Sequence, residues 1–366
     1  MTDLSELTTL RVGGPARRML APETREGLIA AALEIWSGFD DWLVLGGGSN
    51  VVVADEGVDG DVLRVVNRGI RAAPQADGSV HLLVEAGEAW DGVVAFAVAN
   101  RLAGIEALSG IPGTAGAAPI QNIGAYGQEL GNTLVAVDFL DFGSGEVERI
   151  AASELGLGYR TSAIKKGRLG IALGLELRLT ASADGLSLPI AHDQLATVLG
   201  VELGARVPLA DVRAAVIALR ASKGMIWDAA DPDSISAGSF FTNPIVSENF
   251  ARGLPPGAPR WPTEPERPAQ VLPLGTPIPP LAVPGASEFR VKLSAAWLIE
   301  HSGISRGFAL PGSGAAISSK HTLAIINRGS ATARDVVQLA NYVQTRVMSE
   351  FGVMLHPEPV LVGIQL

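Results

Sequence analysis

Three stretches of the chain carry apolar side chains at the three- and four-residue spacing of an amphipathic helix, and we predict a helix over each. The apolar positions are Leu28, Ala32, Leu33 and Trp36; Leu209, Val212, Val216 and Leu219; and Val336, Ala340, Val343, Val347 and Phe351. Thr24 is the expected N-cap of the first helix. Thr332 and Asp335 predict a capping box at the start of the third, and Gly352 predicts its end.

Shorter apolar runs predict further elements. Helices are expected over residues 90–102, with Gly104 just past the C-terminus, and over residues 292–301. Alternating apolar and polar residues between 134 and 180 predict strands, separated by turns near 143–145.

A glycine cluster, Gly46-Gly47-Gly48-Ser49-Asn50, lies between two short apolar runs at 42–45 and 51–53. The second run is Val-Val-Val, and β-branched residues favour a strand. A dinucleotide-binding Rossmann turn needs a helix directly after its glycines, so this cluster predicts a strand–turn–strand instead. The backbone N–H groups of such a turn can form a nest for an anion.

Two other segments have unusual composition. Residues 104–130 are rich in glycine, low in charge and interspersed with Ile and Leu, a pattern typical of an ordered functional loop. Residues 253–287 contain eleven prolines and predict a long surface insertion or linker. With the helices and strands above, the pattern predicts an α+β protein, and 366 residues suggest two or three domains.

The composition of the chain excludes several kinds of active site and binding partner. The chain has no cysteine, which excludes a disulfide framework, a thiolate metal site and a cysteine nucleophile, and its five histidines lack metal-ligand spacing, so we expect no metal. A net charge of −10 disfavours nucleic acid and acidic membranes as partners. We find no run of about 18 apolar residues and no secretory signal, and therefore expect a cytoplasmic protein without membrane insertion.

Several motifs occur together in one order along almost the whole chain. They are residues 10–16, LRVGGPA; residues 46–50, GGGSN; residues 111–127, IPGTAGAAPIQNIGAYG; residues 158–160, GYR; residues 236–244, SAGSFFTNP; and Glu358 between two prolines. Each motif is weak alone. The ordered set resembles the bacterial UDP-N-acetylenolpyruvoylglucosamine reductases.

The resemblance implies an enzyme that reduces UDP-N-acetylglucosamine enolpyruvate to UDP-N-acetylmuramate in peptidoglycan precursor synthesis. NADPH would be the hydride donor and FAD the cofactor; since the chain lacks cysteine, we expect non-covalent FAD. The implied fold is an FAD-binding module of the PCMH/vanillyl-alcohol-oxidase type plus a C-terminal α/β substrate-binding domain. The expected division is residues 1–66 with 352–366, residues 67–223, and residues 224–351 including the proline-rich insertion. We expect a monomer.

Two glycine-rich loops match the family's cofactor-binding positions. These are Gly46, Gly47, Gly48, Ser49 and Asn50 in the first loop, and Gly113, Thr114, Gly116, Ala117, Asn122, Ile123, Gly124, Ala125 and Tyr126 in the second. Glycine allows the close approach of backbone to a phosphate, and Ser and Thr add hydroxyl donors. Either cluster alone is more often a simple tight turn; together they favour a cofactor site.

Three residues match the family's catalytic positions. The resemblance implies that hydride passes from flavin N5 to the enolpyruvyl β-carbon and that Ser239 donates a proton to the α-carbon. Arg160, which stays charged, would stabilise the enolate. Glu358 completes the set, and its role stays open: it is protonated, shares a proton, or holds Arg160 or a water in place. Without the family match, Arg160 and Glu358 would equally well be ordinary strand residues, and Ser239 would far more often be a solvated loop serine.

For the nucleotide sugar, the resemblance points to Arg220, Lys223, Asn243 and His321. Longer members of the family carry a tyrosine on a loop that closes over the diphosphate; residues 189–193 have none, and His192 is the candidate to replace it. Two other functions stay open from the sequence: another FAD-dependent oxidase on the same module, and a non-catalytic protein that binds a flavin or a nucleotide sugar.

Overall fold

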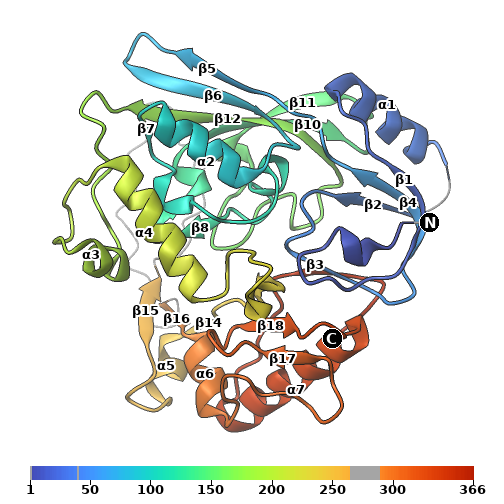
Figure 1. Cartoon of the computed structure of the whole chain (residues 1–366), viewed down its shortest axis with the longest axis vertical. Coiled ribbons are helices and arrows are strands. Elements are labelled where there is room, and N and C mark those ends of the chain that lie inside the picture. Colours follow the sequence, from blue (N-terminus) through green and yellow to red (C-terminus); the bar gives the residue numbers. More distant parts are fainter. Residues whose placement is uncertain (1, 39–40, 264–288) are drawn as a thin grey trace, which may run out of the picture.

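A computed structural model describes residues 2–38, 41–263 and 289–366. Its N-terminal part is a small parallel sheet covered by one helix (Figure 1). The sheet has the order β1-β4-β2. The elements are β1 Ala16–Leu20, α1 Arg25–Trp36, β2 Trp42–Leu45 and β4 Val58–Arg64, preceded by the 3₁₀ turn Leu4–Glu6.

Helix α1 confirms the first predicted helix, and the Thr24 side chain accepts a hydrogen bond from the amide of Gly27 as its N-cap. One detail of the prediction is wrong: Leu33 is 40% exposed. The buried stripe runs through Leu28, Ala32 and Ile35, and Leu33 lies one position, about 100° of helical rotation, away from Ala32.

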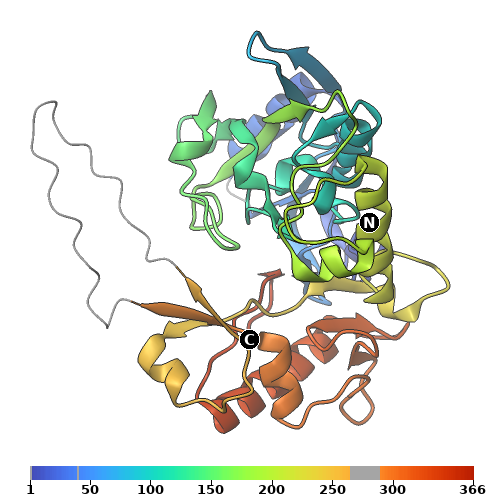
Figure 2. The same cartoon turned by 90° about the vertical axis from the view of Figure 1, so that its left-hand side faces the viewer.

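Strand β3, Val51–Val53, follows the first glycine cluster as predicted, but it does not pair with β2. Its partner is the parallel strand β19, Val360–Val362, at the C-terminal end of the chain. Figure 2 shows this last strand rise from the lower part of the molecule toward the N-terminal part. The pairing carries the segment that contains Glu358 back to the glycine cluster.

A larger antiparallel sheet follows, in the order β11-β10-β12-β6-β5, with the short β7 on the end of β12. Its strands are β5 Ile70–Pro74, β6 Ser79–Glu85, β7 Leu102–Ala103, β10 Leu134–Asp141, β11 Val147–Ala151 and β12 Gly170–Ala181. Helix α2, Trp90–Ala99, packs against it through Trp90, Val93 and Val94, all buried. The predicted strands between 134 and 180 are confirmed.

Helix α2 is shorter than predicted. Arg101 adopts a left-handed backbone with φ +56°, and Leu102 and Ala103 then pair with the end of β12 instead of continuing the helix. Gly104, the predicted C′ residue, lies beyond that strand. Pairing with a distant partner therefore overrides the local helical pattern.

Residues 104–130 form an ordered succession of short elements, with buried Ile105, Leu108, Ile123 and Leu130 in the core. The elements are the 3₁₀ turns Glu106–Leu108, Ala115–Ala117 and Leu130–Asn132, with β8 Gly124–Ala125 and β9 Gln128–Glu129. After the 3₁₀ turn Ala152–Glu154 and strand β12 come α3, Asp193–Leu199, and α4, Leu209–Ser222. Helix α4 confirms the second predicted stripe, with all four positions buried.

The C-terminal part contains two three-stranded sheets, ordered β13-β18-β17 and β14-β16-β15, with three helices around them (Figures 1 and 2). The elements are the 3₁₀ turn Pro232–Ser234, β13 Ser236–Ser239, β14 Ile245–Ser247, α5 Glu248–Arg252, β15 Arg260–Thr263, β16 Arg290–Leu293, α6 Ala295–His301, β17 Ala315–Ile317, β18 Ala324–Asn327 and α7 Ala333–Phe351.

Helix α7 begins with the predicted capping box of Thr332 and Asp335 and ends at Gly352 in a left-handed conformation. Helix α6 begins three residues later than predicted, at Ala295, because Arg290–Leu293 forms a strand between β14 and β15, and the Ser294 side chain caps the helix. Of the proline-rich stretch, residues 264–287 lie outside the described residues.

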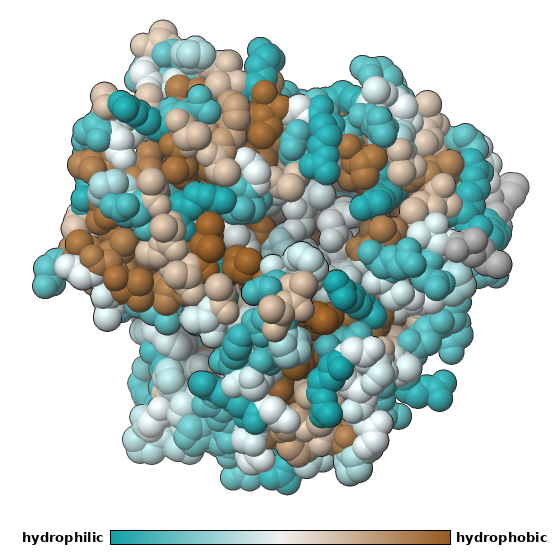
Figure 3. Space-filling model, in the orientation of Figure 1, coloured by the Kyte–Doolittle hydropathy of each residue, from teal (hydrophilic) through white to brown (hydrophobic). Residues whose placement is uncertain are grey.

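The elements form an α+β protein, as predicted. Its largest buried cluster unites the C-terminal part with Leu10, Val12 and Val52 of the N-terminal part. The expected division at residues 66, 223 and 351 stays a prediction. Among the described residues, no helix is both long and apolar enough to span a bilayer. In Figure 3, apolar and polar side chains are mixed over the visible face, which is hollowed near its middle.

Candidate active site

The two predicted glycine-rich loops pack directly against each other. A Cβ atom added to Gly47 would lie 2.6 Å from Cα of Gly113, and one added to Gly46 would lie 2.6 Å from Oγ1 of Thr114. Gly113 itself has φ +110° and leaves room for the Ser49 side chain. Glycine is therefore required here for contact between the loops as well as for access of a ligand to the backbone.

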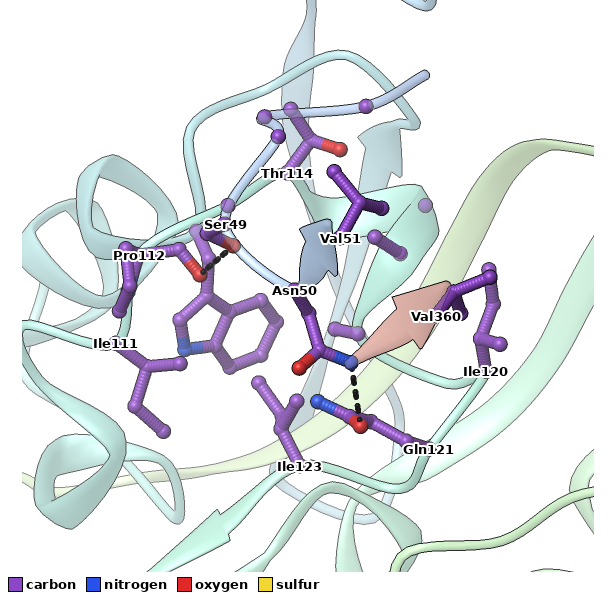
Figure 4. A pocket seen from close by; sticks show the side chains of 18 of the residues that line it. Ser49, Asn50, Val51, Ile111, Pro112, Thr114, Ile120, Gln121, Ile123 and Val360 are labelled. Atoms are coloured by element: carbon purple, nitrogen blue, oxygen red, sulfur yellow. Dashed lines mark hydrogen bonds between the residues drawn. The ribbon is translucent and has the colours of Figure 1, made fainter. Parts of the chain in front are cut away.

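Polar side chains join the same loops (Figure 4). The Ser49 hydroxyl donates to the carbonyl of Pro112 at 3.2 Å, and the Asn50 amide donates to Oε1 of Gln121 at 2.9 Å. Asn50 also donates to the carbonyl of Glu358 at 3.3 Å, and its own carbonyl accepts from the amide of Val360. One residue of the first loop thus ties together the second loop and the C-terminal segment.

The backbone of the first loop is built to receive an anion. No acceptor among the described residues takes a hydrogen bond from the amides of Gly46 to Asn50. Consecutive free amides at a turn form a nest that suits a phosphate. In the second loop, by contrast, the amides of Ala115 and Gly116 donate to the carbonyls of Glu88 and Ala86. The free amides of the first loop therefore fit a cofactor with a diphosphate.

Both loops line one cavity of about 330 Å³. The same cavity is lined by the three predicted catalytic residues, Arg160, Ser239 and Glu358, which come from three separate segments of the chain. Of the predicted cofactor-binding residues, it is lined by Gly46, Gly47, Gly48, Ser49, Asn50, Gly113, Thr114, Gly116, Ala117, Ile123 and Gly124. Asn122, Ala125 and Tyr126 are not among its lining residues, and their part in cofactor binding stays a prediction.

Arg160 is held by backbone and by charge. It adopts a left-handed conformation, φ +52°, and its guanidinium donates to the carbonyl of Gly124 at 2.7 Å and to that of Asn122 at 3.4 Å. Its Nε atom lies 3.3 Å from Oε1 of Glu358. The Asn122 side chain in turn holds the adjoining turn through the carbonyl of Gly158. The guanidinium is thus fixed at several points before any substrate binds.

Glu358 is also fixed by its neighbours. Its amide donates to the carbonyl of Phe240 at 2.8 Å, which anchors it beside the strand that ends at Ser239. Its side chain is only 14% exposed. Burial raises the pKa of the Glu358 carboxyl, and the positive charges of Arg160 and Lys165 act in the opposite direction.

Ser239 ends strand β13, which pairs with β18. The preceding Gly238 has φ +74°, and the following Phe240 and Phe241 are almost fully buried, with their rings edge to face. The two buried rings anchor the loop, while Ser239 lines the cavity.

The charged side chains on the cavity wall are mostly positive. Within the described part of the chain they are Arg160, Lys165 and Arg220, against the single carboxyl of Glu358. Arg220 donates to the carbonyls of Gly110 and Met225, and burial lowers its pKa. Sequence reasoning missed Lys165, which follows Arg160 by five residues; no local pattern distinguishes it from its exposed neighbour Lys166.

The other predicted substrate residues do not line this cavity. Lys223 donates to Oε1 of Gln194 at 3.0 Å and lies over the Tyr126 ring. Burial lowers the pKa of His321 to about 4, with Lys223 and Arg306 adding to the shift. Asn243 is tied to the fold, because its amide donates to the Tyr159 hydroxyl and its side-chain oxygen accepts from the amide of Ala295.

His192, the candidate replacement for the loop tyrosine, lies against Tyr126, whose ring also contacts Lys223. Its ring is edge-on to Tyr126 at 5.4 Å, and its Nδ1 atom is buried with no hydrogen-bond partner among the described residues. Burial and the charge of Lys223 lower its pKa. Its replacement of the tyrosine stays a prediction.

Comparison with known proteins gives consistent matches over the chain. A family model described as "FAD binding domain" matches residues 16–151, and one described as "UDP-N-acetylenolpyruvoylglucosamine reductase, C-terminal domain" matches residues 231–362. These matches confirm the predicted fold class.

Two curated relatives named UDP-N-acetylenolpyruvoylglucosamine reductase match over 95% or more of their length. The protein from Leifsonia xyli subsp. xyli is 59% identical over 378 residues, covering 100% of both chains. That from Saccharopolyspora erythraea is 47% identical and covers 99% of this chain and 95% of the relative. The crystal structure of the Thermus caldophilus reductase of this name has a TM-score of 0.62 at 26% identity, covering 99% of this chain and 97% of that one.

Proposed function

This chain belongs to the UDP-N-acetylenolpyruvoylglucosamine reductase family, and from that premise we propose that Arg160, Ser239 and Glu358 are its catalytic cluster. The enzyme is an FAD-dependent oxidoreductase that reduces UDP-N-acetylglucosamine enolpyruvate with NADPH. The observation that carries the proposal is that three residues from distant segments line one cavity with the two glycine-rich loops.

Each residue of the cluster has its own role in the reduction. FAD, held by the two glycine-rich loops, would supply the hydride for the β-carbon of the enolpyruvyl group. Negative charge then develops on the substrate carboxylate, and the guanidinium of Arg160 stabilises it. A single well-placed donor of this kind contributes roughly 3–4 kcal/mol to the transition state. Ser239 donates the proton that the α-carbon needs.

Glu358 positions Arg160. Of the three roles open from the sequence, this one is supported by the 3.3 Å separation between the carboxylate and the Nε atom. The remaining guanidinium nitrogens are held by the carbonyls of Asn122 and Gly124. A planar guanidinium with five donors serves all of these acceptors at once, which an ammonium group does not.

Arg220, Lys223, Asn243 and His321 bind the nucleotide sugar in this proposal. Support comes from the two cations: neither Arg220 nor Lys223 has a carboxylate within ion-pair distance among the described residues. A substrate diphosphate would supply the missing negative charge. His321, with a pKa of about 4, is neutral at pH 7 and acts there as a hydrogen-bonding group. We also propose that the enzyme acts as a monomer in the cytoplasm.

An anaerobic two-step experiment tests the cluster. NADPH reduces the flavin of the purified enzyme, and UDP-N-acetylglucosamine enolpyruvate then reoxidises it. For Glu358→Gln we expect reduction by NADPH to stay near the wild-type rate and reoxidation by substrate to slow about 100-fold or more. The exposed Glu350→Gln is the matched control. Equal rates for both variants in the second step would contradict the proposal.

A further inference from the structure

One charged side chain on the cavity wall has no part in the proposed mechanism. Lys165 lines the cavity together with Arg160, Ser239 and Glu358. With Glu358 ionised, the charges of Arg160, Lys165 and Arg220 leave the wall with an excess of positive charge. Lys165 is the member of this set whose position depends on the turn directly after Arg160.

A buried serine fixes that turn. The Ser162 hydroxyl donates to the carbonyl of Ile120 at 2.5 Å and accepts from the amide of Lys165 at 3.1 Å. Ser162 is fully buried, and Ile120 belongs to the second glycine-rich loop. The backbone of Lys165 is therefore anchored to the cofactor-binding part of the cavity, whereas Lys166, the next residue, is exposed.

The Lys165 ammonium is partly buried, and no carboxylate lies within ion-pair distance of it in the described residues. It shares the cavity wall with Glu358. Burial lowers the pKa of Lys165, and the Glu358 carboxylate acts in the opposite direction. The same interaction lowers the pKa of Glu358 against the effect of burial. In the described parts of the chain, the other ionisable groups that act on or near Glu358 are Arg160 and Tyr159.

We propose that Lys165 is a positioning residue of the catalytic cluster that favours the ionised form of Glu358 and so supports its ion pair with Arg160. The inference rests on the proposed function, since it gives Lys165 a role through Glu358 alone. A carboxyl buried beside one cation is held in its charged form less firmly than one beside two. Removing the Lys165 charge therefore favours the protonated acid and weakens the hold on Arg160.

The test is a direct titration of Glu358 in the FAD-loaded enzyme by infrared difference spectroscopy. The carboxylic-acid band of Glu358 is the band that disappears in Glu358→Gln. We expect Lys165→Met to raise the titration midpoint by about one pH unit. Lys165→Arg should stay near wild type because it keeps the charge, and Lys166→Met serves as the matched control. Lys165→Gln replaces the Met variant if that variant loses FAD.

The outcomes separate the two proposals. An unchanged midpoint in the Lys165 variants that lack the charge would overturn the inference. An equal shift in Lys166→Met would do the same, since it would show a general effect of net charge. The pH profile of substrate-driven reoxidation tests the proposed function separately: a moved midpoint without a moved profile would support the ionic coupling and contradict the catalytic role of Glu358.

Discussion

The Nε atom of Arg160 lies 3.3 Å from a carboxylate oxygen of Glu358, and the two residues belong to different parts of the chain. Arg160 lies in the turn between the 3₁₀ turn Ala152–Glu154 and β12, and Glu358 lies just before the last strand. Both side chains are mostly buried, at 20% and 14% exposure. A partly buried ion pair of this kind is screened less by solvent than a surface pair. Its geometry depends on the parallel pairing of β19 with β3.

Replacement of Arg160 by lysine tests the need for a guanidinium. An ammonium keeps the charge but does not span the carbonyl of Gly124 and the Glu358 carboxylate together. For Arg160→Lys we expect substrate-driven flavin reoxidation to slow about 100-fold, with reduction by NADPH little changed. Stopped-flow absorbance measures both steps. The exposed Arg334→Lys is the control, and an Arg160→Lys enzyme as fast as this control would show that charge alone suffices.

Loss of the Ser239 hydroxyl should slow flavin reoxidation by the substrate but leave flavin reduction by NADPH nearly unchanged. In Ser239→Ala the flavin still meets NADPH, but the α-carbon lacks its proton donor, so we expect the second step to fall by roughly 10²–10⁴. Single-turnover kinetics in H₂O and D₂O measure the solvent isotope effect on proton transfer to the α-carbon. The control is the exposed Ser330→Ala. Equal slowing of both half-reactions in Ser239→Ala would point to a damaged cavity and against proton donation.

Helices with strong local signals are predictable from this sequence. The capping box of Thr332 and Asp335 and the buried stripe of α4 appear as expected. The errors fall where a short apolar segment joins a distant strand: Leu102 and Ala103 pair with β12, and Arg290–Leu293 lies between β14 and β15. A local pattern contains no information about such partners.

In the site, too, local features can be predicted from the sequence, whereas contacts between distant segments cannot. The glycine clusters are visible as motifs, but their direct contact at Gly47 and Gly113 depends on tertiary packing. The proposed catalytic residues follow from the family resemblance, and their convergence on one cavity requires the strand pairing of β19. Lys165 was missed because a lysine facing a cavity and an exposed one look alike in sequence.

The contact between the loops predicts a loss of cofactor in Gly47→Ala. The added methyl would meet backbone atoms of Gly113 at 2.6 and 3.0 Å, which cannot move aside as a flexible side chain can. Overpacking of this kind costs about 1–3 kcal/mol, so we expect FAD to bind roughly 10- to 100-fold more weakly. Fluorescence titration of the apoenzyme with FAD measures the change. Gly257→Ala, which adds a methyl in open space, should bind FAD like the wild type; an equal affinity in Gly47→Ala would refute the packing argument.

Protonation of His321 predicts a dependence of stability on pH. Burial lowers its pKa from 6.5 to about 4, so between these values the unfolded chain binds a proton that the folded protein does not. Stability from this group is therefore complete above pH 6.5 and is lost as pH falls toward 4. Between pH 7 and pH 5 the loss is about 2 kcal/mol. Glu358, whose pKa is raised, acts in the opposite direction in this window, and His192, whose pKa is lowered, acts in the same direction, so only a comparison of variants isolates His321.

Urea unfolding of the FAD-saturated wild type, His321→Gln and the exposed His356→Gln at pH 7 and pH 5 makes that comparison. We expect the free energy of unfolding of His321→Gln to fall by about 2 kcal/mol less than that of the wild type over this interval, while His356→Gln follows the wild type. The decisive quantity is the difference between the two proteins in the stability lost from pH 7 to pH 5. If His321→Gln loses as much stability on acidification as the wild type, burial and the charges of Lys223 and Arg306 do not hold the imidazole neutral in the folded protein.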